Sequence, residues 1–205
     1  MKLISLNVGL FEANNDHLKK FFTEQEPDFV ALQEVTRRVD TKALDHFVSK
    51  DSIDESTSKL LYSFFGPLSV LNKFEQKNFH GKELFTFDLE GFVEFGNYVK
   101  SKHEIFKARN IFVQNCFTYA IDMSDWPAED YRAVEVVDMN IGGKKLRLLN
   151  YHGIWTKNKI GHDLTLEACR KIHKLATEVD YSSIICGDFN LFPDTPSMNV
   201  FSKDF

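Results

Sequence analysis

The chain has 205 residues, of which 43% are hydrophobic and 27% are charged, and its formal net charge is −5. This length predicts a single domain over residues 1–205, and the acidic balance (pI near 5.8) argues against duplex DNA binding through bulk charge. Three scattered cysteines argue against a disulfide framework and a cysteine zinc site, and no apolar run reaches membrane-spanning length, so we expect a cytoplasmic protein.

The N-terminal part of the chain predicts two parallel strands joined by a helix. Leu3–Val8 and Asp28–Gln33 are apolar on both faces, which is typical of strands in a buried sheet. Between them, residues 14–26 carry apolar side chains at helical spacing. A strand–helix–strand succession of this length indicates a crossover unit, which places the strand ends at Asn7 and Glu34 side by side.

The middle of the chain predicts one more helix and a group of strands. Residues 40–49 have helical apolar spacing, and the polar residues 51–58 predict a surface loop. Residues 60–113 contain repeated short apolar runs that predict several strands, and one of these strands includes residues 96–102. Residues 124–130 predict a loop.

A β-hairpin is the clearest predicted element. Residues 131–141 alternate between apolar and polar, Gly142 and Gly143 supply a two-residue turn, and residues 144–151 return. His152 follows this second strand directly, so it is expected at a strand end.

A helix and a buried strand are predicted after the loop over residues 153–162. Asp163 is expected to cap the helix. Its predicted buried face consists of Leu166, Cys169, Ile172, Ala176 and Val179. The strand over residues 183–186 ends at a glycine, after which Asp188 and Asn190 follow with one residue between them. Side chains at this spacing point the same way in a strand, so the two would share one small space.

Polar residues thus end four predicted strands, namely Asn7, Glu34, His152 and the pair Asp188 and Asn190. Each alone has a structural explanation as a turn residue, a solvated strand end or a hydrogen-bonded histidine. Together at one edge of a sheet, these polar residues predict a functional site. The set is rich in oxygen and has a single histidine, which favours Mg²⁺ or Mn²⁺ over Zn²⁺.

The order and context of these motifs resemble the endonuclease/exonuclease/phosphatase superfamily from residue 3 to about residue 198. The resemblance is carried by Leu6-Asn7-Val8, Leu32-Gln33-Glu34-Val35, Gly96-Asn97-Tyr98, Asn150-Tyr151-His152 and Gly187-Asp188-Phe189-Asn190. It implies an α/β (α+β) fold, a four-layer α/β sandwich with two mostly antiparallel sheets packed face to face and helices outside. It also implies hydrolysis of a phosphoester by metal-assisted attack of water on phosphorus.

The resemblance further implies a role for each candidate site residue. Glu34 is similar to the main ligand of Mg²⁺ or Mn²⁺, with Asn7 in the same network of metal and water. Asp188 resembles the acidic partner that orients or activates water and assists the leaving oxygen, and Asn190 resembles its companion in binding phosphate and nucleophile. His152 matches a histidine that donates to a phosphoryl oxygen.

The sequence departs from the family at its C-terminal end. Thr195 and Pro196 predict the start of a further helix, and the last residues, 202–205, lack the histidine of the family's terminal Ser-Asp-His-like motif. The chain could be a fragment, a naturally truncated and inactive protein, or one whose site a partner completes. We favour the fragment, because the closing strands of the second sheet would be missing. We therefore expect this chain alone to be weakly active or inactive.

The sequence assigns no residue to substrate binding. Trp155, Lys157 and Lys159, in the loop after His152, could contact a phosphate or stack on a base, and a solvated loop with one anchoring tryptophan explains them equally well. The acidic pI and the lack of a signal-peptide pattern favour a nucleic-acid end, a nucleotide or a small phosphorylated metabolite as substrate over the lipid substrate of a secreted sphingomyelinase. The alternative to an enzyme is a non-catalytic binding or scaffold protein derived from the same fold.

Overall fold

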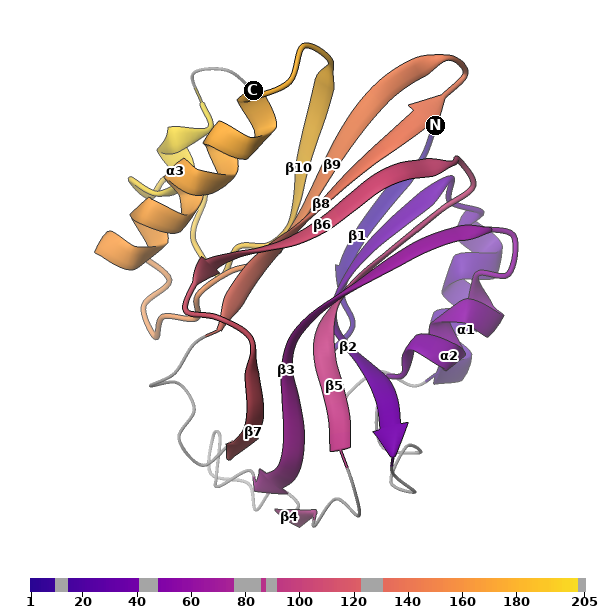
Figure 1. The fold of residues 1–205 in the computed structure, drawn as a ribbon, viewed down its shortest axis with the longest axis horizontal. Coiled ribbons are helices and arrows are strands. Elements are labelled where there is room, and N and C mark those ends of the chain that lie inside the picture. Colours follow the sequence, from indigo (N-terminus) through magenta and orange to yellow (C-terminus); the bar gives the residue numbers. More distant parts are fainter. Residues whose placement is uncertain (10–14, 41–47, 76–85, 88–91, 123–130, 203–205) are drawn as a thin grey trace.

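The structure is a computed structural model that describes residues 1–9, 15–40, 48–75, 86–87, 92–122 and 131–202 (Figure 1). Its strands are β1 (Leu3–Asn7), β2 (Phe29–Asp40), β3 (Tyr62–Glu75), β4 (Thr86–Phe87), β5 (Phe92–Ser101), β6 (Ile105–Gln114), β7 (Thr118–Asp122), β8 (Arg132–Ile141), β9 (Lys144–His152) and β10 (Ser182–Asp188). Its helices are α1 (Asn15–Gln25), α2 (Lys50–Ser56), α3 (Asp163–Thr177) and the 3₁₀ helix η3 (Met198–Val200).

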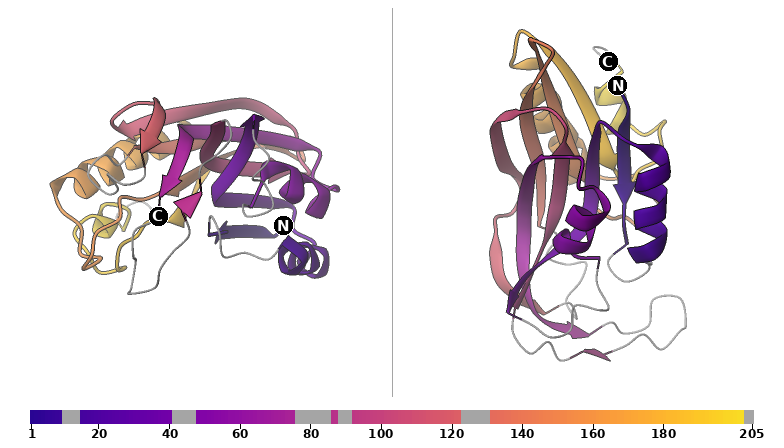
Figure 2. Two further views of the ribbon diagram at one scale, coloured as in Figure 1. Left: turned by 90° about the horizontal axis from the view of Figure 1, so that it is seen from below. Right: turned by 90° about the vertical axis from the view of Figure 1, so that its right-hand side faces the viewer.

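Two sheets and two sets of helices form four layers. The first sheet has the order β1-β2-β5-β3-β4, with β7 also paired to β3, and the second has the order β10-β9-β8-β6. Most strand pairs are antiparallel, and the parallel ones are β1–β2, β9–β10 and β3–β7. Helices α1 and α2 cover the outer face of the first sheet and α3 that of the second (Figures 1 and 2). This arrangement confirms the predicted sandwich.

Alternation along the strands of the first sheet divides their side chains between two cores. In β2, Val30 and Leu32 pack in the cluster that includes Phe22 of α1 and Ile53 of α2. The intervening residue, Ala31, belongs to a different cluster that lies between the two sheets. Successive side chains of a strand point to opposite faces, so a strand that is apolar throughout is what a sheet covered on both faces requires.

The second sheet repeats this division. In β9, Leu148 packs between the sheets, whereas Leu149 and Tyr151 pack with Ile172 of α3. The hairpin of β8 and β9 has the predicted register, with Ile141 opposite Lys144 across the Gly142-Gly143 turn. The hairpin and the expected parallel pairing of β1 with β2 are therefore confirmed.

One local prediction is wrong, and a second fails at the ends that the structure describes. The polar residues predicted as a loop include helix α2, which the Ser49 side chain caps by accepting a hydrogen bond from the Ser52 backbone N–H at 3.1 Å. A single buried apolar residue, Ile53, fixes that helix, so it shows no apolar period. The helix predicted over residues 40–49 is not found where the structure describes them, because Asp40 ends β2 and residues 48 and 49 precede α2. Residues 41–47 of that helix, and the predicted loop at 124–130, lie outside the described residues.

The C-terminal elements differ from expectation in detail. The N-cap of α3 is His162 rather than Asp163, because the His162 Nδ1 atom accepts the Leu164 backbone N–H at 3.2 Å. The buried face of that helix consists of Thr165, Ala168, Cys169, Ile172 and Ala176. Strand β10 is an edge strand of the described sheet and is half-buried rather than buried. After it, the Thr195 carbonyl accepts the Asn199 backbone N–H at 3.0 Å, and the short 3₁₀ helix η3 is the only helix between β10 and residue 202, the last residue that the structure describes.

No helix within the described ranges is long and apolar enough to cross a membrane.

Candidate active site where the two sheets meet

The carboxyl ends of two parallel strand pairs, one from each sheet, come together at one point. In the first sheet Asn7 ends β1, and in the second sheet Asp188 lies beside His152 in register. The Asn7 side-chain Nδ2 donates to Glu34 Oε1 at 3.0 Å and to Asp188 Oδ2 at 3.0 Å. A single amide therefore joins carboxylates that come from both sheets.

Glu34 reaches this point through a β-bulge and not, as predicted, by ending its strand. Strand β2 continues to Asp40, and its pairing with β5 shifts register between Leu32 and Val35. Glu34 lies in this interruption with a φ of 62°. A left-handed conformation costs a residue other than glycine roughly 1–2 kcal/mol, and bulges commonly redirect a side chain beside an active site.

Asp188 and Asn190 lie together as predicted, but a turn after β10 brings them together and not the alternation of a strand, because Asp188 is the last residue of β10. The Asn190 backbone N–H donates to Asp188 Oδ1 at 2.9 Å, and the Asn190 side-chain Nδ2 donates to the Gly153 carbonyl at 3.2 Å. Asn190 has a φ of 56°, a conformation that asparagine tolerates better than most residues. The turn therefore fixes the carboxylate and the amide relative to each other.

Hydrogen bonds keep the Asp188 carboxyl ionised in this half-buried place. Burial alone would raise its pKa, but the donors Asn7 and the Asn190 backbone, together with the charge of Lys159, hold that pKa below its usual value. Asp188 is therefore a carboxylate at neutral pH, and it can accept a hydrogen bond from a water molecule.

His152 is buried beside the two carboxylates. Only 3% of it is exposed, and its Nε2 lies 3.6 Å from Glu34 Oε1. Burial, with the nearby charge of Arg132, lowers the pKa of His152 to about 3, although Asp188 acts in the opposite direction. The imidazole is thus neutral at physiological pH. Its Nδ1 atom is buried and has no hydrogen-bond partner in the described part of the chain.

The oxygen atoms of this cluster fit a hard divalent cation. Glu34 Oε1 and Asp188 Oδ2 bond to the same Asn7 nitrogen, so the two carboxylates lie within two hydrogen-bond lengths of each other. In the described ranges no three His, Cys, Asp or Glu side chains gather as a ready-made metal site. Mg²⁺ needs no such cage, because it keeps several waters and binds through one or two carboxylates.

Two basic residues beside the cluster were not predicted to belong to it. Lys159 Nζ donates to Asn190 Oδ1 at 2.6 Å and lies 5.0 Å from the centre of the Trp155 ring. Arg132 is 1% exposed, and its Nε donates to the Gly153 carbonyl at 2.9 Å. The sequence placed Lys159 in a loop without a role and Arg132 in an alternating strand, and no local signal distinguishes either of them.

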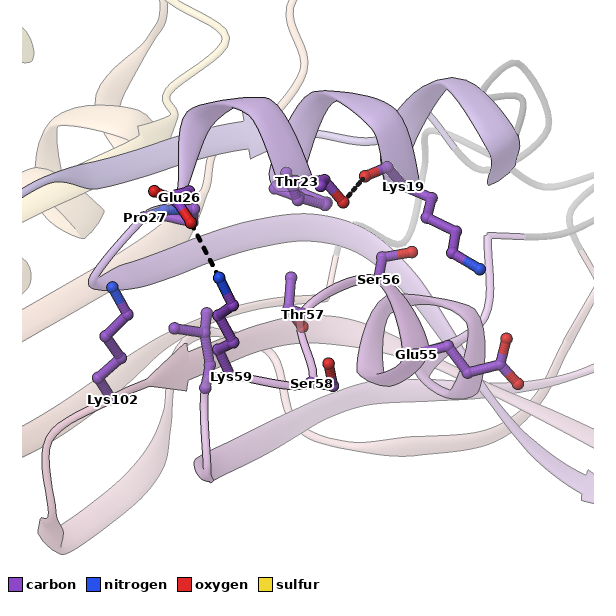
Figure 3. A pocket seen from close by; sticks show the side chains of 12 residues that line it. Lys19, Thr23, Glu26, Pro27, Glu55, Ser56, Thr57, Ser58, Lys59 and Lys102 are labelled. Carbon is purple, nitrogen blue, oxygen red and sulfur yellow. Dashed lines mark hydrogen bonds and ion pairs between the residues drawn. The ribbon is translucent and has the colours of Figure 1, made fainter.

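A hollow between α1 and α2 lies away from this cluster (Figure 3). It is lined mainly by polar residues of both helices and of the segment after α2. Two of these residues, Lys59 and Glu26, form an ion pair with 2.9 Å between Nζ and Oε1. None of the predicted site residues lines it. Its mixed charges match no particular ligand.

The fold is that of the endonuclease/exonuclease/phosphatase proteins, which confirms the resemblance at the level of fold. A protein of this family from Beutenbergia cavernae is 16% identical and superimposes with a TM-score of 0.64, covering 100% of this chain and 53% of its own. TDP2 from D. rerio, in complex with a single-strand DNA product, is 17% identical with a TM-score of 0.58, covering 98% of this chain and 64% of its own.

A mannosyl-6-phosphatase from Bacteroides thetaiotaomicron is 12% identical with a TM-score of 0.58, covering 98% of this chain and 69% of its own. The chain thus spans about half to two thirds of the length of these three proteins. No family model and no curated protein matches the sequence.

Proposed function

We propose that the chain belongs to a phosphoester hydrolase that depends on Mg²⁺ or Mn²⁺. The observation that carries this proposal is the convergence of Glu34 and Asp188 on the Asn7 amide, with His152 and Asn190 adjoining. The proteins of similar fold support it, because one of them is a phosphatase and another was solved in complex with a DNA product. A scaffold has no physical need for two carboxylates held this close together.

The residues have separate proposed roles. Glu34 and Asn7 would hold the metal ion, which when bound would supply Lewis-acid polarisation of the P–O bond. Asp188, kept ionised by its hydrogen bonds, accepts a proton from the attacking water or orients it. Asn190 positions Asp188 and faces the phosphate. His152 is neutral, so it can donate one N–H to a phosphoryl oxygen without adding charge.

Metal binding is the first test, because it requires no turnover. Mg²⁺ or Mn²⁺ at about ten times its Kd should stabilise the chain by about 1.4 kcal/mol and raise the melting temperature by about 3–6 °C. Glu34→Gln should remove this shift. Glu167→Gln, on the exposed face of α3, is the matched control and should retain it. If the wild-type chain shows no shift at millimolar metal, the metal site is rejected and the scaffold reading is favoured.

Hydrolysis is the second test of the same proposal. Bis(p-nitrophenyl) phosphate, single-stranded DNA, a nucleotide and a sugar phosphate sample the proposed substrate classes. We expect turnover that requires the metal, and we expect Asp188→Asn to lower it by at least about a hundredfold while leaving the melting temperature of the metal-free chain nearly unchanged. Undiminished turnover in Asp188→Asn would reject the role of Asp188.

A further inference from the structure

The predicted site residues by themselves have an imbalance of charge. Glu34 and Asp188 are two carboxylates, and one divalent cation would neutralise them. A phosphoester brings at least one more negative charge, and in phosphoryl transfer that charge is spread over the oxygens of the phosphoryl group. A cationic side chain facing the substrate would compensate this negative charge, because fixed charges in a partly buried site act more strongly than in water.

Lys159 is placed to supply that charge. Its ammonium lies 2.6 Å from Asn190 Oδ1, and Asn190 in turn bonds through its backbone to Asp188. An ammonium has three N–H donors, and Asn190 accepts only one of them.

The loop holds Lys159 in this position. The Lys159 backbone N–H donates to the Thr156 carbonyl at 3.1 Å, and its own carbonyl accepts the Phe192 N–H at 2.9 Å. Its φ of 56° is a left-handed conformation that a residue with a side chain adopts at a cost of roughly 1–2 kcal/mol. The ring of Trp155 lies beside the ammonium at 5.0 Å, within cation–π range. Contacts within its own loop and with the loop after β10 therefore fix a strained residue, which is common in ligand-binding segments.

We propose that Lys159 binds a non-bridging oxygen of the substrate phosphate directly, as the cationic phosphate contact of this site. This inference rests on the proposed function and adds a phosphate-binding residue to it. Lys157, two residues earlier in the same turn, is exposed and provides a matched lysine without these contacts.

The test measures inorganic phosphate binding in the presence of Mg²⁺ by calorimetry, with Lys159→Met, Lys159→Arg and Lys157→Met variants of the full chain. Loss of one charge-assisted hydrogen bond should weaken phosphate binding by about tenfold or more in Lys159→Met. Lys159→Arg should retain most of the affinity, and Lys157→Met should match the wild type. Phosphate binding by Lys159→Met as tight as that of the wild type, or no phosphate binding by the wild type, would overturn the inference.

A purely positioning role through Asn190 gives a different result. In an Asn190→Ala background, adding Lys159→Met should still weaken phosphate binding by about tenfold if the ammonium contacts phosphate itself. No further loss would show that Lys159 acts only by holding Asn190, and the inference would fail. Metal-dependent hydrolysis with unchanged phosphate binding in Lys159→Met would reject this inference alone. Absence of both the metal shift and hydrolysis in the wild type would reject the proposed function.

Discussion

Buried polar side chains connect the two sheets beneath the candidate site. Glu135 of β8 is fully buried, and its two carboxyl oxygens accept the Gly66 backbone N–H at 2.8 Å and the Asn150 side-chain N–H at 2.7 Å. Asn150 Nδ2 also donates to the Leu32 carbonyl at 3.0 Å, and Asn150 Oδ1 accepts from Gln33 Nε2 at 2.6 Å. These bonds tie the second sheet to strands of the first. A carboxyl in such a place disfavours its charged form, and burial raises the pKa of Glu135 well above its usual value.

This raised pKa predicts a specific pH dependence of stability. The folded chain retains the Glu135 proton at pH values where the unfolded chain has lost it, so this contribution is full below the unfolded pKa and is lost as pH rises towards the folded one. Between about pH 4.5 and pH 8, the free energy of unfolding of Glu135→Gln should therefore fall less than that of the wild type. The two falls should differ by about 1.4 kcal/mol for each unit that separates the folded and unfolded pKa values of Glu135. Urea denaturation at several pH values measures this.

The control for that experiment is Glu167→Gln, at an exposed position of α3. Its curve of stability against pH should run parallel to that of the wild type. The side-chain NH₂ group of the glutamine would face one of the two N–H donors that bond to Glu135. Glu135→Gln is therefore expected to be less stable than the wild type at acidic pH. A curve for Glu135→Gln that runs parallel to the wild type would show that the buried carboxyl is ionised when folded.

At the scale of elements, the end of β10 must lie very close to β9. Gly187 has a φ of 137°, and a Cβ atom there would lie 1.9 Å from the Tyr151 carbonyl oxygen. Just beyond it, the Gly153 backbone N–H donates to the Asp188 carbonyl at 2.6 Å. This close parallel pairing brings Asp188 beside His152, so the glycine is a structural requirement of the candidate site.

We predict that Gly187→Ala destabilises the chain by more than about 2 kcal/mol, because a clash with backbone adds to the strain of a positive φ. Gly142→Ala separates the two effects. Gly142 has a φ of 58° in the hairpin turn, but its added Cβ would meet nothing within 4 Å, so only about 1 kcal/mol of strain is expected. Denaturant midpoints compare the stabilities of the two variants. Equal destabilisation would show that the short distance from Gly187 to the Tyr151 carbonyl adds nothing to the cost of the substitution.

At the scale of the whole molecule, the two sheets share one interior. Ala31 and Val99 of the first sheet pack with Val137, Met139 and Leu148 of the second. The hydrogen bond from Asn7 to Asp188 crosses the same boundary. Neither sheet could keep its inner face out of water without the other, so the two should unfold together.

Leu148→Ala tests this cooperativity. The side chain is fully buried between the sheets, and its truncation should lower the free energy of unfolding by about 2–5 kcal/mol. We expect the transitions followed by far-UV circular dichroism and by tryptophan fluorescence to shift together and remain coincident. Leu164→Ala, at an exposed position on α3, is the control and should change stability by less than about 0.5 kcal/mol. Two separate transitions would contradict a shared core.

Local sequence signals determined much of the fold and the membership of the cluster. A period of two residues and the Gly142-Gly143 turn fixed the hairpin, because both depend on residues adjacent in the chain. The spacing of Asp188 and Asn190 placed them together for the same reason. Helix α2 was missed because a single buried residue, Ile53, holds it, and one contact produces no apolar period.

Tertiary structure alone decided how the cluster is arranged. Asn7 and Asp188 are 181 residues apart and meet only because the sheets pack face to face. The bulge that turns Glu34 towards them is a property of strand pairing and not of its neighbours in the chain. The place of Lys159 likewise depends on a loop from elsewhere in the molecule. Residue types and spacing determine which side chains lie at strand ends. The distances between these side chains arise from long-range packing, which no local pattern encodes.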